Sequence, residues 1–303
     1  MIKKLINIIR HSLYYSSNMD SVVRNISKKE IKILHLQNRN FASTEIGITN
    51  EEYFNHNVIV SLTTYGKRIH DVYLTIESLM QQTVKPNKII LWLDKNEFTM
   101  ENIPQTLKNL KKRGLTIEFC KNIRSYKKLV PALRKFPNDI IITIDDDVIY
   151  QYDLIETLLY SYNQNPDLIH FCRGHRMILK KDNTLEKYNN WNLVVNDCKI
   201  DKLNFPTGVG GVLYPPYSLH PYVTDENVFL TLAPNADDVW FKAMALLQGT
   251  LSKKVFTHSS IGEDYIDLDG EIQKETALNT ANVIGNKNDE QIKAVFSKYN
   301  ILL

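Results

Sequence analysis

A run of apolar, β-branched residues that ends at three consecutive carboxylates limits most strongly how this chain can fold. The segment reads Asp139-Ile-Ile-Ile-Thr-Ile-Asp145-Asp146-Asp147. A strand that is apolar on both faces fits the middle of a parallel sheet, where helices cover both sides. The carboxyl ends of such strands are where α/β sheets bind ligands. The segment therefore predicts a central strand with a ligand site at its end.

The three carboxylates predict a bound cation. Side chains alternate along an extended chain, so we expect Asp145 and Asp147 on one side and Asp146 on the other. Adjacent like charges repel one another, and carboxylate oxygens are the ligands that Mg²⁺, Mn²⁺ and Ca²⁺ prefer. A solvated acidic turn is the alternative, but uncompensated charge is costly beside so apolar a strand. An EF-hand calcium loop does not match, because Tyr150 stands where that loop requires glycine.

From about residue 57, short apolar segments alternate with amphipathic ones, which predicts an α/β fold with a mostly parallel central sheet and helices on both faces. Polar residues follow each expected strand, so a binding crevice is expected along one rim of the sheet. Neither a Gly-x-Gly-x-x-Gly after the first strand nor a Gly-Lys-Ser/Thr is present, so nicotinamide and P-loop sites are not expected. We expect strands at 58–64, 88–94, 115–120, 139–144 and 168–176, and helices at 71–82, 101–112, 126–135, 152–162 and 237–247.

Composition and charge indicate a globular chain with a basic start. The 303 residues are 43% hydrophobic, enough for one large domain with additions or for two small ones. Eight basic and two acidic side chains in the first 40 residues give +6, so a total of +3 leaves −3 for the remainder. Residues 1–13 have the pattern of a short basic amphipathic helix that either lies on a membrane surface or packs on protein. This segment lacks the features of a secretory signal, and the three cysteines form no Cys-x-x-Cys pair, so a cytoplasmic location is expected.

A second acidic pair, Asp237-Asp238, opens the last expected helix. Carboxylates in a first helical turn stabilise the helix dipole, so a purely structural role is one interpretation. The alternative is a catalytic carboxylate that accepts a proton from a substrate hydroxyl.

Together these segments resemble the GT-A glycosyltransferases, and the chain is similar to the family 2 group that builds bacterial surface polysaccharides. The matching pieces are the first strand and its turn at 60–68, the helix and turn at 78–86, and the strand that ends at Asp94. The three carboxylates stand in the place of the Asp-x-Asp motif, and Asp237-Asp238 stand where the family carries Glu-Asp. The resemblance implies a basic extension over 1–56, a GT-A domain over 57–263 with a donor half (57–150) and an acceptor half (151–263), and a helical tail over 264–303.

The resemblance also implies an activity and a set of site residues. The expected reaction is metal-dependent, inverting transfer of a sugar from a nucleoside diphosphate, with UDP as the expected nucleotide, to a hydroxyl of a glycan or lipid-linked acceptor. Mn²⁺ or Mg²⁺ is the expected cofactor, held by Asp145, Asp147 and a late His258. Asp238 is the expected general base, with Asp237 beside it. The donor would contact Thr63, Thr64, Tyr65, Arg68, Asp94, Lys128, Asp145 and Asp146, and the acceptor would contact Gly210, Gly211 and Trp240.

Two other classes of protein remain open from the sequence. A noncatalytic sugar- or nucleotide-binding protein of the same fold would lack the base, whereas this chain keeps both acidic sites. A haloacid-dehalogenase-like phosphatase also places Asp-x-Asp after a buried strand. That class requires the strand near its start and Thr or Val two places after the second Asp, where this chain has Ile149.

Overall fold

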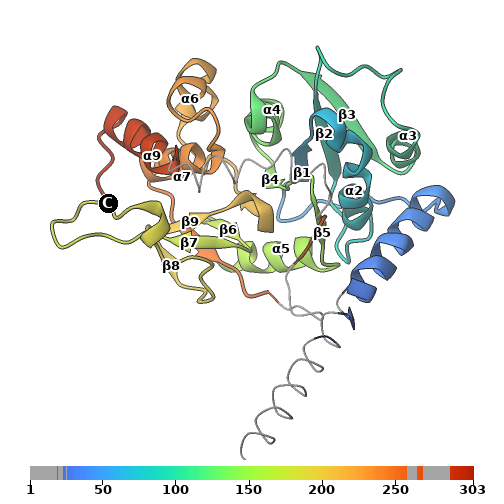
Figure 1. The fold of residues 1–303 in the computed structure, drawn as a ribbon, viewed down its shortest axis with the longest axis horizontal. Coiled ribbons are helices and arrows are strands. Elements are labelled where there is room, and N and C mark those ends of the chain that lie inside the picture. Colours follow the sequence, from blue (N-terminus) through green and yellow to red (C-terminus); the bar gives the residue numbers. More distant parts are fainter. Residues whose placement is uncertain (1–18, 20–22, 25, 258–264, 269–286) are drawn as a thin grey trace, which may run out of the picture.

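The computed structural model describes residues 19, 23–24, 26–257, 265–268 and 287–303 (Figure 1). Its centre is an eight-stranded sheet with the strand order β3-β2-β1-β4-β10-β6-β11-β8. Within the described residues, no helix combines the length and apolar character needed to cross a membrane.

The first half of the sheet is the parallel unit that the sequence predicts. β1 pairs in parallel with both β2 and β4, and β2 pairs in parallel with β3. The β-branched residues of β4 are fully buried, as expected for a strand covered on both faces. The bounds are β1 Val58–Thr63, β2 Lys88–Asp94, β3 Leu115–Cys120 and β4 Ile140–Thr143.

The second half of the sheet is mixed and is made of shorter strands. β10 is antiparallel to both β4 and β6, β11 runs parallel to β6, and β8 closes the edge antiparallel to β11. Two small ribbons lie outside this sheet, one of β5 with β12 and the other of β7 with β9. The bounds are β5 Val148–Tyr150, β6 Ile169–Phe171, β7 Gly174–Arg176, β8 Ile200–Asp201, β9 Asn204–Pro206, β10 Val212–Tyr214, β11 Ser252–Lys254 and β12 Tyr265–Asp267.

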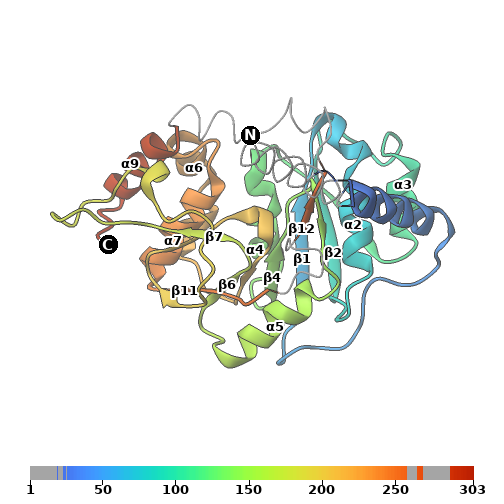
Figure 2. The same ribbon diagram turned by 60° about the horizontal axis from the view of Figure 1, so that its bottom comes forward.

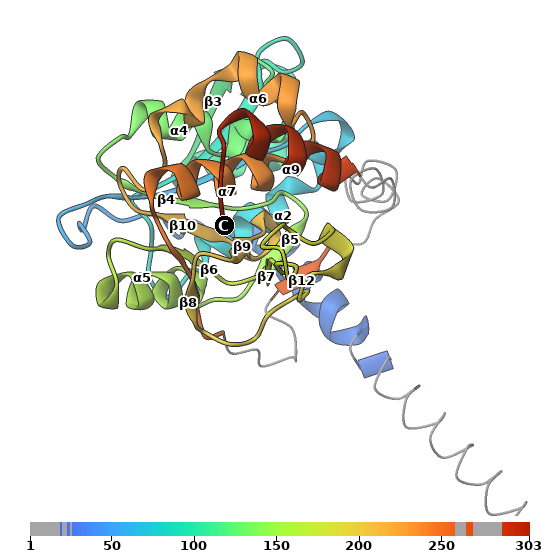
Figure 3. The ribbon, with the colours of Figure 1, turned by 90° about the vertical axis from the view of Figure 1, so that its left-hand side faces the viewer.

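Helices cover both faces of the sheet, so the predicted fold class is confirmed. Val58, Val60 and Leu62 of β1 belong to an apolar cluster that includes α2, α3 and α5 on one face, whereas Ile59 belongs to a second cluster that includes α4, α6, α7 and α9. In Figure 1, α2 and α3 lie with β1–β3 at one end of the molecule and α6, α7 and α9 at the other; Figure 3 shows α9 lying along α7. The bounds are α2 Val72–Met80, α3 Gln105–Lys111, α4 Val130–Lys135, α5 Leu154–Gln164, α6 Glu226–Leu232, α7 Asp237–Gln248 and α9 Lys287–Lys298.

Two predicted elements are each divided in the structure. The helix expected over 126–135 is a 3-10 turn, Arg124–Lys128, followed by α4, because Pro131 is compatible only with the first turn of a helix. The strand expected over 168–176 is β6 and β7, which belong to different sheets. The break places Arg173, between these strands, at the cleft described below.

A helix over residues 26–42 packs beside α2 and α3 (Figure 2). Leu36 of this helix is fully buried against Leu74 and Ile149. Asn40 donates to the backbone oxygen of Thr106 at 3.1 Å. These contacts fix the helix on the α/β domain.

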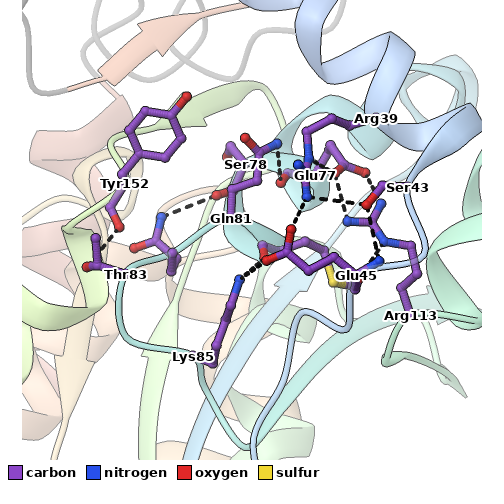
Figure 4. Close-up of polar contacts among 12 residues, drawn as sticks. Arg39, Ser43, Glu45, Glu77, Ser78, Gln81, Thr83, Lys85, Arg113 and Tyr152 are labelled. Carbon is purple, nitrogen blue, oxygen red and sulfur yellow. Dashed lines mark hydrogen bonds and ion pairs between the residues drawn. The ribbon is translucent and has the colours of Figure 1, made fainter.

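A buried ion pair lies below the end of this helix (Figure 4). Arg113 donates to both carboxylate oxygens of Glu77, at 2.6 and 3.0 Å. The side chains are 3% and 0% exposed, respectively. Arg39 from the helix adds a contact of 3.5 Å to the same carboxylate and also pairs with Glu45. The polar cluster therefore joins residues 39–45 to α2 and to Arg113, in the turn between α3 and β3.

Candidate active site

One cleft of about 830 Å³ brings together the two acidic segments that lie some ninety residues apart in the sequence. It opens at the carboxyl ends of β1 and β4, the rim where the sequence predicts binding. The predicted site residues that line it are Thr63, Tyr65, Arg68, Lys128, Asp145, Asp146, Asp147, Asp237 and Asp238.

The three consecutive carboxylates lie after the end of the strand, which corrects one part of the prediction. β4 ends at Thr143, and Asp146 and Asp147 lie in a turn, so the alternation of an extended chain does not apply to them. The side chain of Asp146 is only 8% exposed, whereas those of Asp145 and Asp147 are 28% and 29% exposed. The turn therefore makes Asp145 and Asp147 the more accessible pair, although for a different reason from the one predicted.

Asp146 is held inside by two donors. Arg68 Nη1 donates to Asp146 Oδ1 at 2.8 Å and to Asp147 Oδ2 at 3.0 Å. The Thr64 hydroxyl donates to Asp146 Oδ2 at 2.5 Å. Burial nevertheless raises the pKa of Asp146, and burial together with Asp146 and Asp145 raises the pKa of Asp147 to about 6. At Asp147, repulsion from Asp146 and Asp145 thus outweighs the attraction of Arg68.

Lys128 connects the two acidic segments. Its ammonium lies 2.9 Å from Asp145 Oδ1 and 2.9 Å from Asp237 Oδ2, the second contact being an ion pair without hydrogen-bond geometry. Burial alone would lower the pKa of Lys128, but Asp145, Asp237 and Asp238 together raise it well above its ordinary value. Lys128 is therefore a permanent cation between the two sites.

The two carboxylates at the start of α7 have different surroundings. Asp237 is buried and accepts from the Ser125 hydroxyl at 2.8 Å in addition to its contact with Lys128. Asp238 is partly exposed to the cleft, and from the described residues its Oδ2 accepts only a long bond of 3.4 Å from the Gly208 backbone. Burial and the neighbouring Asp237 raise the pKa of Asp238 to about 7, despite the opposing effect of Lys128. Neither side chain caps the helix, whose N-cap is Ala236, so capping does not explain the pair.

Five predicted site residues do not line this cleft. Thr64 lies behind Asp146, and Asp94 is buried in its own turn, where it accepts from the Asn96 backbone at 2.9 Å. A side chain on Gly210 would meet Arg173, and one on Gly211 would meet Leu154 and Ile144, so both glycines pack against the protein.

The prediction that Trp240 contacts the acceptor is wrong. Its side chain is fully buried, and its indole N–H donates to the Val223 backbone at 3.1 Å while its ring packs against Phe229 and Tyr299. Helical periodicity turns this residue toward the core, although its neighbour Asp238 faces the cleft. His258 lies outside the described residues.

The sequence interpretation missed Ser125 and Gly208. A side chain on Gly208 would collide with the Lys128 ammonium and come within 3.0 Å of Asp145 Oδ1. The run Gly208-Val-Gly210-Gly211 signals a close approach of the backbone, but it does not identify the partner. Ser125 carries no recognisable signal, because only the fold places it beside Asp237.

The residues of the turn fit a divalent cation only together with a ligand that brings its own oxygen atoms. Among the described residues, no three His, Cys, Asp or Glu side chains are arranged to hold a metal. Mg²⁺ is commonly bound by one or two carboxylates together with substrate phosphates and water. Asp145 and Asp147, both accessible from the cleft, match this pattern.

Comparison with known proteins gives the following similarities. No family model matches the chain. The glucosyl-dolichyl phosphate glucuronosyltransferase of Haloferax volcanii is 27% identical over 113 residues, which is 37% of this chain and 36% of that protein. The chain therefore matches about a third of the length of this curated relative.

Two solved structures are also similar. One is the mannosyltransferase PcManGT from Pyrobaculum calidifontis in complex with GDP-Man and Mn²⁺, which is 10% identical with a TM-score of 0.48, over 93% of this chain and 74% of that one. The other is residues 1–349 of S. aureus TarS in complex with UDP, which is 12% identical with a TM-score of 0.45, over 69% of this chain and 59% of that one.

Proposed function

We propose that this chain is a GT-A glycosyltransferase that moves a sugar from a nucleoside diphosphate to an acceptor hydroxyl with inversion. One observation carries the proposal: the accessible carboxylates Asp145 and Asp147 share a cleft with Asp238, whose pKa is about 7. The resemblance of the sequence motifs and the similarity to a curated glycosyltransferase agree with this assignment. The donor is a nucleoside-diphosphate sugar, with UDP as the expected nucleotide, and the acceptor is a glycan or lipid-linked saccharide.

The contacts of the cleft residues give each of them a different role in this proposal. Asp238 accepts the proton of the attacking hydroxyl, and a pKa near 7 suits a base that works at neutral pH. Asp237 remains paired with Lys128 and Ser125, so it holds Lys128 in place and is not free to act as the base. Arg68 keeps the turn of Asp146 and Asp147 in one conformation.

Asp145 and Asp147 are the residues that would hold Mn²⁺ or Mg²⁺. A divalent ion at this position supplies Lewis-acid stabilisation of the charge on the departing diphosphate. The division into a donor half over 57–150 and an acceptor half over 151–263 stays part of the proposal, as does a location on the cytoplasmic side of a membrane. The expected membrane segment, residues 1–13, lies outside the described residues.

The first test is binding of the donor. Thermal melts with UDP-glucose, UDP-N-acetylglucosamine or GDP-mannose in Mn²⁺ should show an increase in melting temperature for one of them, because a ligand of the native state stabilises it by about 2.7 kcal/mol at 100 times its Kd. EDTA or Asp147→Ala should abolish the increase. Asp167→Ala, at an exposed carboxylate away from the cleft, is the matched control and should retain it. An increase that survives both EDTA and Asp147→Ala would exclude the metal-bridged donor site.

A further inference from the structure

The wall of the cleft formed by β7 and β9 holds a buried histidine that the reaction as proposed leaves without a role. His175 lies on β7 opposite Phe205 of β9, and both residues line the cleft. His175 is only 5% exposed. The three residues that the sequence predicts for the acceptor, Gly210, Gly211 and Trp240, are described and do not line this cleft. The acceptor therefore requires other contacts.

One hydrogen bond fixes which ring nitrogen of His175 carries the proton. The Val194 backbone N–H donates to His175 Nδ1 at 3.0 Å. Burial and Arg173 lower the pKa of His175 to about 4, against the opposing effect of the Gly174 carbonyl, so the ring is neutral at pH 7. A neutral imidazole has one N–H and one acceptor nitrogen. Because Nδ1 is the acceptor, the proton of His175 is on Nε2.

This Nε2–H donor is open to the cleft. The contacts of the His175 ring with the described residues are the bond from Val194 and an edge contact with the Tyr188 ring, whose centroid lies 5.6 Å away. Nε2 is not among the described buried side-chain nitrogen atoms that lack a partner, so it is accessible, and the space that His175 lines is the cleft. An unsatisfied donor is costly, so water or a ligand oxygen must complete this hydrogen bond.

The residue that holds His175 has a strained backbone. Val194 has a φ of 52°, and it alone is β-branched among the described non-glycine residues with a positive φ. This region is unfavourable for β-branched residues, and such strain persists mainly at functional sites. In this conformation Leu193 and Val194 stay 52% and 46% exposed and line the cleft. They form an apolar surface next to the His175 donor.

The same ribbon connects His175 to the proposed base. Phe205, opposite His175, is followed three residues later by Gly208, whose N–H donates to Asp238 Oδ2 at 3.4 Å. Three extended residues span about 10 Å, so His175 lies at a distance of this order from Asp238. Burial, together with the charge of Asp238, raises the pKa of Tyr188, whose ring contacts His175, to about 12. A molecule that reacts at Asp238 can therefore extend to His175.

We propose that His175 is a specificity residue for the acceptor, whose saccharide donates or shares an oxygen atom with the Nε2–H of His175 while its C–H face packs on Leu193 and Val194. A saccharide carries both the oxygen acceptors and the apolar ring face that this wall complements. The inference rests on the proposed transfer reaction and requires a saccharide, instead of a plain lipid alcohol, at the acceptor position.

The test is NMR titration of the full chain with the methyl glycosides of glucose, galactose, mannose and N-acetylglucosamine. At least one should bind the wild type. His175→Asn keeps an oxygen near the position of Nδ1 that can accept from Val194 but removes the Nε2–H, so it should bind that glycoside at least about tenfold more weakly. His175→Gln places its amide nitrogen near the position of Nε2, so it should bind within about threefold of the wild type.

Two further variants separate a binding role from a structural one. His170→Asn changes another buried histidine, which contacts Ser161 and does not line the cleft, so it should bind the glycoside like the wild type. Leu193→Ser, at an exposed position, should weaken binding severalfold without a change in melting temperature, and it tests the site even where His175→Asn does not fold. Circular dichroism establishes that each variant is folded.

Donor binding distinguishes a failure of this inference from a failure of the proposed function. A wild type that binds a nucleotide sugar with Mn²⁺ but none of the glycosides would overturn the role of His175 and leave the transferase standing. Binding by His175→Asn or Leu193→Ser at the wild-type level would do the same. Equal losses of binding in His175→Asn and His175→Gln, with lowered melting temperatures, would assign His175 only to holding Val194. A wild type that binds neither a nucleotide sugar nor a glycoside would overturn both proposals.

Discussion

The buried ion pair between Glu77 and Arg113 should be one of the most sensitive points in the fold. Arg113 holds the fully buried Glu77 with two hydrogen bonds and also donates through Nε to the Glu45 backbone oxygen at 2.8 Å. Arg113→Met removes all three donors and leaves the Glu77 carboxylate with only Arg39 at 3.5 Å. An ion left without its partner in the interior costs about 3–5 kcal/mol of unfolding free energy.

The same principle predicts that removing both charges is far less harmful. In Glu77→Met/Arg113→Met both charges of this pair are removed and Arg39 keeps Glu45, so the stability should return to within about 1–2 kcal/mol of the wild type. With an unfolding entropy of about 2.1 cal/mol/K per residue, a 303-residue chain changes its melting temperature by roughly 1.6 °C per kcal/mol. Arg113→Met should therefore melt about 5–8 °C lower than the wild type, and the double variant should recover most of this loss.

Urea denaturation of the four proteins of the double-mutant cycle provides the measurement. Lys135→Met is the matched control, because Lys135 pairs with Glu118 at 2.6 Å while both side chains stay substantially exposed. Exposed pairs contribute about 0–1 kcal/mol, so this variant should be nearly as stable as the wild type. A loss below 1 kcal/mol in Arg113→Met, or no recovery in the double variant, would refute the reasoning.

Two further predictions concern the cleft and the response to acid. Gly208→Ala should reduce turnover at least about tenfold with a small change in melting temperature, because the new methyl group displaces the Lys128 ammonium from between Asp145 and Asp237. Gly249→Ala is the control: this glycine has open space around it but a positive φ, so the variant should lose stability and keep activity. Equal activities of the two variants would argue against the role of Lys128. Burial lowers the pKa values of His170 and His175 to about 4. Between pH 6.5 and 4 these histidines therefore bind more protons in the unfolded state than in the folded state. Their contribution to the unfolding free energy falls as the pH falls, by at most about 3 kcal/mol per histidine. Asp147 and Asp238, whose pKa values are raised, act in the opposite direction in both proteins, so the measurement is the difference between the wild type and His170→Gln. In urea melts at pH 7, 6 and 5 the wild type should lose stability relative to His170→Gln as the pH falls, and a constant difference would contradict the role of His170.

The sequence alone predicts the parallel half of the fold because its signals are local. Four apolar segments separated by amphipathic ones correspond to β1, β2, β3 and β4, with differences of a residue or two at their ends. The helix expected over 101–112 is shorter, starting at Gln105, because Pro104 occupies its N-cap. The ribbons β5–β12 and β7–β9 consist of three-residue strands, which are too short for an alternating pattern to identify.

The sequence likewise identifies some residues of the candidate site and not others. Asp145, Asp147 and Asp238 were recognisable because carboxylates at the end of a strand or at the start of a helix stand out in sequence. The contact of Lys128 with both Asp145 and Asp237 depends on tertiary packing between β4, α7 and the 3-10 turn at 124–128. The acceptor contact predicted for Trp240 rests on its proximity to Asp238 in sequence, but on a helix two residues correspond to a rotation of about 200°.

Turnover of the Asp238→Asn variant tests the central claim most directly. With a nucleotide sugar and an acceptor that support transfer by the wild type, release of the nucleoside diphosphate should fall by roughly two to four orders of magnitude, because the asparagine cannot accept the proton. The Kd for the donor should remain unchanged, since this interaction acts in the transition state. Asp237→Asn, which weakens only the hold on Lys128, should lose less. Near-wild-type turnover in Asp238→Asn would contradict the assignment of the base and, with it, the inverting transfer proposed for this cleft.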